Sequence, residues 1–320
     1  AALLHDGRRG EGDGSVVQLM IAQQRQLQRV KHLFRGICAC TEHIGILFFQ
    51  FMGSCSICFE RSRCKCCIEY FFGPVVNASR AISYQVNSAI NSFAQNLTLA
   101  MSPQIIKSYA CNDIHRVLQL LFRGTKFSYF LILFLSIPVI LETKYVLSLW
   151  LGQVPEYTLI FVRLVIVNTL IDSFTYIIGA TVQATGRIKK YQLCVGGILL
   201  LNLPLSYFFL RLGFSPYITF LIAILIAILC LVVRVLLLNS LLRFSIREFV
   251  EKILGLSLLV TFMSYVLPFI IYISFAEGFM RFLLVVVAGI IGALISIWFV
   301  GFGYTEREFV KKMIFVKSNI

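Results

Sequence analysis

Of the 320 residues in the chain, 58% are hydrophobic and only 14% are charged, and the mean hydropathy is +0.85. Soluble domains carry roughly 25% charged residues, so this composition excludes a water-soluble globular protein for most of the chain. Lys and Arg outnumber Asp and Glu by 29 to 15. The basic residues form no clustered patch, so we expect no nucleic-acid partner. The composition predicts an integral membrane protein.

The first 70 residues differ in character from the rest. They begin with a segment rich in Gly, Gln and Arg and then contain seven of the ten cysteines. The spacings Cys55-x-x-Cys58 and Cys64-x-Cys66-Cys67 admit a zinc site, and an oxidising compartment would admit disulfides. The interpretation that we favour is a segment without specific chemistry, out of frame or joined on near residue 70. We therefore expect no metal site and no cofactor.

Apolar segments separated by short charged loops follow from residue 71 onward. About 20 mostly apolar residues are needed to cross a bilayer. Six predicted spans meet this requirement: Phe127 to Leu141, Leu159 to Val182, Leu193 to Leu210, Tyr217 to Leu238, Ile253 to Ile273 and Phe282 to Phe302. The first of these can be extended back through Lys126 and Arg123, because long basic side chains can reach the headgroups.

A seventh predicted span, Val75 to Ala100, is polar but long enough, and Ser102-Pro103 follows it. The predicted fold class is an all-α integral membrane protein, a polytopic helical bundle of about seven spans. Residues 71–250 are expected to form one transmembrane bundle, and residues 251–320 two additional helices and a cytoplasmic tail.

The loop charges predict the orientation, because Lys and Arg accumulate on the cytoplasmic side. Alternate loops, with the C-terminal tail, carry 14 basic residues, and the other loops carry only Lys144, Arg211 and Arg281. The sequence therefore predicts a multi-pass protein with a cytoplasmic C-terminus and with the Phe71–Gly73 end outside.

Polar residues in the segment Val75 to Ala100 recur at steps of three or four, which places them on one face of a helix. A cation near the centre of a lipid-exposed helix costs about 2.5 to 3.5 kcal/mol, so this face is expected to point into the bundle or a wet cavity. The amides either bind neighbouring helices or form a hydrophilic path. For the second alternative, Asn and Gln suit sugar hydroxyls and Arg suits phosphate. The candidate substrate-binding residues are Arg80, Tyr84, Asn87, Asn91 and Gln95.

Three ionisable residues lie elsewhere within predicted spans. Arg163 and Arg234 lie toward the ends of their segments and are expected to reach the membrane surfaces. Asp172 lies midway along its segment and must be paired, hydrated or protonated. It is a candidate for proton coupling or for contact with Arg80, or it makes a static helix contact.

Three prolines, Pro138, Pro204 and Pro268, lie within predicted spans, where each removes a helical hydrogen bond and can kink the helix. The pairs Gly196-Gly197 and Gly289 with Gly292 predict close helix approach. We find no phosphate-binding loop, no H-E-x-x-H motif and no sizeable soluble domain. A secondary transporter or flippase is therefore favoured over an enzyme.

Several runs of the chain resemble one family. They are FFGPVVNASRAISYQVNSAINSF (71–93), MSPQIIKSYA (101–110), LWLGQVPEYT (149–158), QATGRIKKYQ (183–192) and LLNLPLSY (200–207). Together they resemble the C-terminal half of bacterial polysaccharide flippases in the multidrug/oligosaccharidyl-lipid/polysaccharide exporter superfamily. The likeness is strongest to lipopolysaccharide or O-antigen flippases of Bacteroides-type bacteria and covers roughly Phe71 to Ile320.

This resemblance implies two six-helix lobes around a central cavity and transport of undecaprenyl-pyrophosphate-linked oligosaccharide across the bacterial inner membrane. Lipid-linked oligosaccharide, membrane lipid and proteins of glycan assembly are the implied partners. Arg80 would attract the pyrophosphate while the other candidate residues line a hydrated track for sugars, with Asp172 as a coupling site. No N-terminal lobe precedes the likeness, so the sequence predicts a fragment. The alternatives are a drug/cation antiporter of the same fold and a membrane scaffold without transport.

Overall fold

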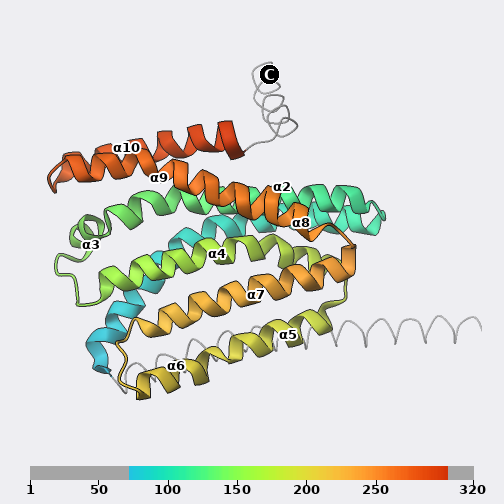
Figure 1. Cartoon of the computed structure of the whole chain (residues 1–320), viewed down its shortest axis with the longest axis horizontal. Helices are drawn as coiled ribbons and strands as arrows, with labels where there is room; N and C mark the ends of the chain where they lie inside the picture. The colour runs from blue at the N-terminus through green and yellow to red at the C-terminus, as the bar shows by residue number, and fades with distance from the viewer. Residues whose placement is uncertain (1–71, 302–320) are drawn as a thin grey trace, which may run out of the picture. The chain divides into compact units, whose positions relative to one another are not determined.

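A computed structural model describes residues 72–301 of the chain (Figure 1), and every regular element in this range is helical. The predicted Cys-rich segment and the C-terminal tail lie outside the described residues. The first described helix covers residues 72–110 and is drawn in blue and cyan in Figure 1. The structure confirms the predicted all-α polytopic bundle.

The remaining elements follow in chain order. They are α2 (Ile114–Leu141), α3 (Thr143–Leu151), α4 (Thr158–Ala184), α5 (Ile188–Leu200), α6 (Asn202–Arg211), α7 (Ile218–Leu242), α8 (Ile246–Phe249), the π-helical turn η1 (Val250–Gly255), α9 (Leu256–Ser274), α10 (Phe279–Ser296) and a second π-helical turn, η2 (Ile297–Gly301).

Six of these helical stretches are long and apolar enough to cross a membrane: Ile114–Leu141, Thr158–Ala184, Ile188–Arg211, Ile218–Leu242, Ile246–Ser274 and Phe279–Gly301. They match the six apolar spans predicted from sequence. The first begins 13 residues before its predicted start, at Ile114 instead of Phe127, so Arg123 and Lys126 lie within a continuous helix. The polar first helix is the seventh long helix of the described range.

The long helices pack in a row (Figure 1). α4 contacts α2 on one side and α7 on the other, and α7 in turn packs on α5 and α6. The α9–α10 hairpin packs on α2 at the other side of the row. We call the helix ends next to the basic residues Arg187 and Arg243 the basic end, and the ends next to loops 152–157, 212–217 and 275–278 the opposite end.

Proline has different effects on two helices. The first helix continues through Pro103 to residue 110, although Ser102-Pro103 was predicted to follow its end. A proline removes one helical hydrogen bond and crowds the carbonyl four residues before it, and burial of Ile105 and Ser108 holds the next turns in place. The helical stretch 188–211, in contrast, is interrupted at Leu201, three residues before Pro204. The predicted kink at Pro204 is therefore present as a break between α5 and α6.

Large apolar side chains cover the outer faces of α9 and α10. Phe262, Phe269 and Phe279 are each at least half exposed. Contiguous apolar surface of this kind marks contact with a membrane or a partner protein. On helices of this length and hydropathy, lipid explains the exposure.

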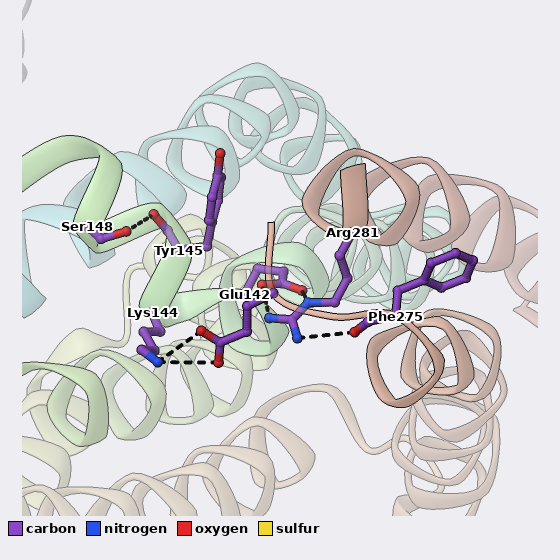
Figure 2. A network of polar contacts seen from close by, with 7 residues as sticks. Glu142, Lys144, Tyr145, Ser148, Phe275 and Arg281 are labelled. Carbon is purple, nitrogen blue, oxygen red and sulfur yellow. Dashed lines mark hydrogen bonds and ion pairs between the residues drawn. The ribbon is translucent and has the colours of Figure 1, made fainter. Parts of the chain in front are cut away.

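A buried ion pair joins the α9–α10 hairpin to the rest of the bundle (Figure 2). Arg281 of α10 donates from Nε and Nη2 to the two carboxylate oxygens of Glu142, at 2.7 and 3.0 Å. Glu142, between α2 and α3, is 2% exposed, and Arg281 is 8% exposed. The guanidinium also stacks 4.7 Å from the ring centre of Tyr272. The sequence pattern had placed Arg281 among the outer loop charges, so its structural role emerges only from the fold.

Glycines of α10 permit the predicted close helix contacts. A Cβ on Gly292 would lie 3.3 Å from the backbone oxygen of Ser264 in α9, and one on Gly289 would lie 3.1 Å from Ile137 in α2. For Gly197 the prediction of close approach is wrong, because a Cβ there would meet nothing within 4 Å.

We expect Gly292→Leu to destabilise the protein by about 1–3 kcal/mol, because the larger side chain must push α9 away from α10. Gly197→Leu is the matched control and should unfold close to the parent. Thermal unfolding in detergent measures both. Equal unfolding temperatures for the two variants would contradict the packing role of Gly292.

Candidate functional site

A polar cavity of about 680 Å³ lies between the first helix, α4, α7 and the α5–α6 break. The first helix contributes six polar side chains at steps of three or four, which extend from Tyr84 to Ser102, together with Leu99. At about 1.5 Å per residue this stripe is about 27 Å long. The hydrocarbon core of a bilayer is about 30 Å thick, so the length of the polar stripe is comparable to that thickness.

The structure places four of the five candidate binding residues in the cavity lining: Tyr84, Asn87, Asn91 and Gln95. The coupling candidate Asp172 also lines the cavity, from α4. The four residues of the first helix share one surface because their spacing places them on one face of that helix, and this face is turned toward α4 and α7. The helix is held in this rotation by burial of Ile90 and Ala94 against α2 and α4.

Hydrogen bonds tie the polar face of the first helix to α4. The Tyr176 hydroxyl donates to Asn91 Oδ1 at 2.7 Å, and Asn91 Nδ2 donates to Asn87 Oδ1 at 2.9 Å. The Thr169 hydroxyl also contacts Asn87 Oδ1. The helix packing among the two sequence-based alternatives is therefore present, because the carbonyl oxygens of Asn87 and Asn91 bind α4. Both residues also border the cavity, as a hydrophilic path would require.

Arg80 lies outside the cavity lining. It is 5% exposed, and its guanidinium stacks 5.2 Å from the ring centre of Tyr84, which does line the cavity. Its Nε and Nη1 are buried without a hydrogen-bond partner. Arg80 thus borders the opposite end of the cavity behind Tyr84, beside an apolar cluster that includes Phe161 and Phe220.

Asp172 lies in a polar stretch of α4. Asn168 donates from Nδ2 to Asp172 Oδ2 at 2.9 Å. The cavity side of α4 carries Asn168, Asp172, Thr175, Tyr176 and Gln183. Sequence reasoning named Asp172 as a site residue but did not assign its polar neighbours on α4 to the site. The same spacing of three and four that marked the first helix could have revealed them.

Arg234 of α7 is the cavity residue that the sequence interpretation placed wrongly. It was expected to reach the membrane surface, yet it lines the cavity. Its Nε is buried without a hydrogen-bond partner, and its guanidinium lies 5.9 Å from the ring centre of Tyr191. Among the described residues, Arg234 is the only Lys or Arg in the cavity lining, and Asp172 is the only acidic residue there.

The chemistry of this lining is that of a neutral, hydrogen-bonding surface with one cation and one carboxylate. Amides and hydroxyls can donate to and accept from sugar hydroxyls, and a guanidinium can bind oxyanions. The side of the cavity formed by α7 also carries apolar residues, among them Phe220 and Ile226. Such a surface suits an amphiphilic or hydroxyl-rich solute.

The chain was compared with protein-family models, curated proteins and solved structures, and none of the three comparisons found a match.

Proposed function

We propose that this helical bundle is the substrate path of a flippase for lipid-linked oligosaccharide, a glycan carried on undecaprenyl pyrophosphate, in the bacterial inner membrane. The observation that carries the proposal is the polar cavity whose wall on the first helix is about 27 Å long. Hydroxyl-rich sugars would move along the amides and hydroxyls of this wall, and the polyprenyl tail would stay in lipid. The runs resembling polysaccharide flippases support the same assignment.

The mechanism follows from the cavity chemistry. Asn87, Asn91 and Gln95 replace water around the sugar hydroxyls, while Tyr84 offers a ring face and a hydroxyl. Arg80, two of whose nitrogens lack partners, attracts the pyrophosphate where the cavity meets the opposite end. Asp172 is the coupling candidate, because a carboxylate in the membrane can exchange a proton. By the loop charges, the basic end and the C-terminus face the cytoplasm.

A reconstitution experiment tests the proposal. The full chain is placed in vesicles that contain a fluorescent undecaprenyl-pyrophosphate oligosaccharide, and a membrane-impermeant reagent reports which leaflet holds the sugar. We expect faster movement between leaflets than in protein-free vesicles. A rate equal to that of protein-free vesicles would overturn the proposal.

A drug/cation antiporter is the second candidate, and Asp172 in the cavity lining favours it. The same vesicles distinguish the two functions. Uptake of an organic cation driven by a pH gradient, without movement of the oligosaccharide, would replace the flippase assignment by the antiporter. If the vesicles show neither activity, the membrane scaffold is the remaining candidate function.

A further inference from the structure

We propose that Arg234 forms an anion-binding site in the cavity, in addition to Arg80. This site, the Arg234 station, binds the phosphate groups of the substrate on the side of the cavity nearer the basic end. The identity of the natural ligand rests on the proposed flippase function. The anion chemistry of Arg234 rests on the geometry of the cavity alone.

The first argument is the state of the Arg234 side chain. Its Nε is buried and has no hydrogen-bond partner, while the guanidinium lies over the ring of Tyr191. Stacking on a ring uses the face of the guanidinium and leaves its in-plane N–H donors unused. These donors form the planar fork that binds phosphate oxygens in bidentate fashion.

The second argument is the support that holds Arg234 in place. Tyr191 of α5 packs against α4, because a Cβ on Gly179 would lie 3.6 Å from the Tyr191 hydroxyl oxygen. Gly179 lines the cavity, and Tyr191 is buried, at 9% exposure. The aromatic platform for Arg234 is therefore fixed between two helices, which reduces the side-chain entropy lost when an anion binds.

The third argument is distance. Phe220 marks on α7 the depth at which Arg80 lies, because its ring packs 6.2 Å from the Tyr84 ring on which Arg80 stacks. Fourteen residues of α7 separate Phe220 from Arg234, and at about 1.5 Å per residue this is about 21 Å along the helix. A single pyrophosphate group is too short to bridge the two arginines, so they would bind the anion at two different depths.

Asp172 lies between these depths. It precedes Gly179 by seven residues on α4, about 10 Å along the helix toward the opposite end. An ionised carboxylate there repels a phosphate group that leaves Arg234 and moves toward Arg80. Along the bundle, the order is therefore Arg234 and Asp172 in the cavity lining, followed by Arg80 outside the lining, behind Tyr84.

Binding of inorganic pyrophosphate to the purified full chain in detergent tests this station. Isothermal titration calorimetry gives the dissociation constant for the parent, for Arg234→Gln and for Arg211→Gln. Arg211 is an exposed basic residue at the end of α6, so it controls for the loss of one positive charge. We expect Arg234→Gln to weaken binding about 10- to 100-fold, and Arg211→Gln to weaken it less than about twofold.

Thiol labelling locates the bound anion. Cys230 lines the cavity one turn before Arg234. With the other nine cysteines replaced by Ser, pyrophosphate should slow modification of Cys230 by a small methanethiosulfonate, and Arg234→Gln should abolish this protection. If Arg234→Gln bound pyrophosphate as tightly as the parent, or if the parent did not bind it, the proposal that Arg234 binds anions would be overturned. Failure of oligosaccharide transport with intact pyrophosphate binding would overturn the proposed function and leave the Arg234 station standing.

Discussion

Arg281→Ala should destabilise the protein by about 3–5 kcal/mol, because it leaves the Glu142 carboxylate buried without its partner. Arg281 donates two charge-assisted hydrogen bonds to Glu142 and connects the α9–α10 hairpin to the α2–α3 corner (Figure 2). Thermal unfolding in detergent should show a midpoint on the order of 10 °C below that of the parent. Glu142→Ala should produce a similar loss, since it leaves the arginine unpaired.

A double variant separates loss of the pair from loss of packing. Replacing both partners by apolar residues of similar size, Glu142→Leu with Arg281→Met, removes both buried charges together. We expect this variant to recover most of the stability that either alanine variant loses. A double variant as unstable as Arg281→Ala would show that the charges themselves are required.

The neighbouring pair Lys144–Glu277 provides an exposed control (Figure 2). Lys144 donates to both carboxylate oxygens of Glu277, at 3.0 and 3.3 Å, and thereby lowers the pKa of Glu277 below its ordinary value of 4.5. The pair stabilises the fold above pH 4.5, and this contribution is lost as the pH falls through the lowered pKa. Both side chains are mostly exposed, so Glu277→Gln should unfold near the parent. If Glu277→Gln lost as much stability as Arg281→Ala, the expected difference between buried and exposed ion pairs would be contradicted.

Ala227→Phe should reduce oligosaccharide movement in vesicles by about tenfold or more. Ala227 is 6% exposed and lines the cavity midway along α7. A phenyl ring there projects into the space that the proposed function assigns to sugars. Because the added bulk enters a cavity and not a packed core, folding should be retained, and the unfolding midpoint should stay within a few degrees of the parent.

The matched control for the cavity is Ile228→Phe on the next residue of α7. Ile228 is 49% exposed and points away from the core, so a ring at this position should leave transport unchanged. Equal transport rates for Ala227→Phe and Ile228→Phe would mean that substrate does not pass through the cavity.

The spans could be predicted from sequence because length and hydropathy are local properties of each segment. The same holds for the polar stripe of the first helix, whose spacing of three and four fixes one face without knowledge of any neighbour. This is why Asn87, Asn91 and Gln95 could be grouped before the fold was known. The missing N–H donor also pointed to a break near Pro204, although α2 and α9 continue through Pro138 and Pro268.

The remaining features depend on contacts between distant parts of the chain. Glu142 and Arg281 are 139 residues apart and pair only because the α9–α10 hairpin packs on α2. The rotation of α7 decides whether Arg234 faces lipid or the cavity, and neighbouring helices set that rotation. Arg80 shares the polar stripe by spacing, yet it stacks behind Tyr84 because the apolar cluster around Phe161 fills that end.

The most direct measurement of the central claim is water accessibility along the first helix. In a chain whose native cysteines are all Ser, single thiols are introduced by Asn91→Cys and Gln95→Cys on the cavity face, and by Phe93→Cys, whose native side chain is 51% exposed and does not line the cavity. A membrane-impermeant thiol reagent added to either side of sealed membranes should modify positions 91 and 95 and leave position 93 unmodified. Unreactive thiols at both 91 and 95 from both sides would contradict a water-filled cavity behind this helix.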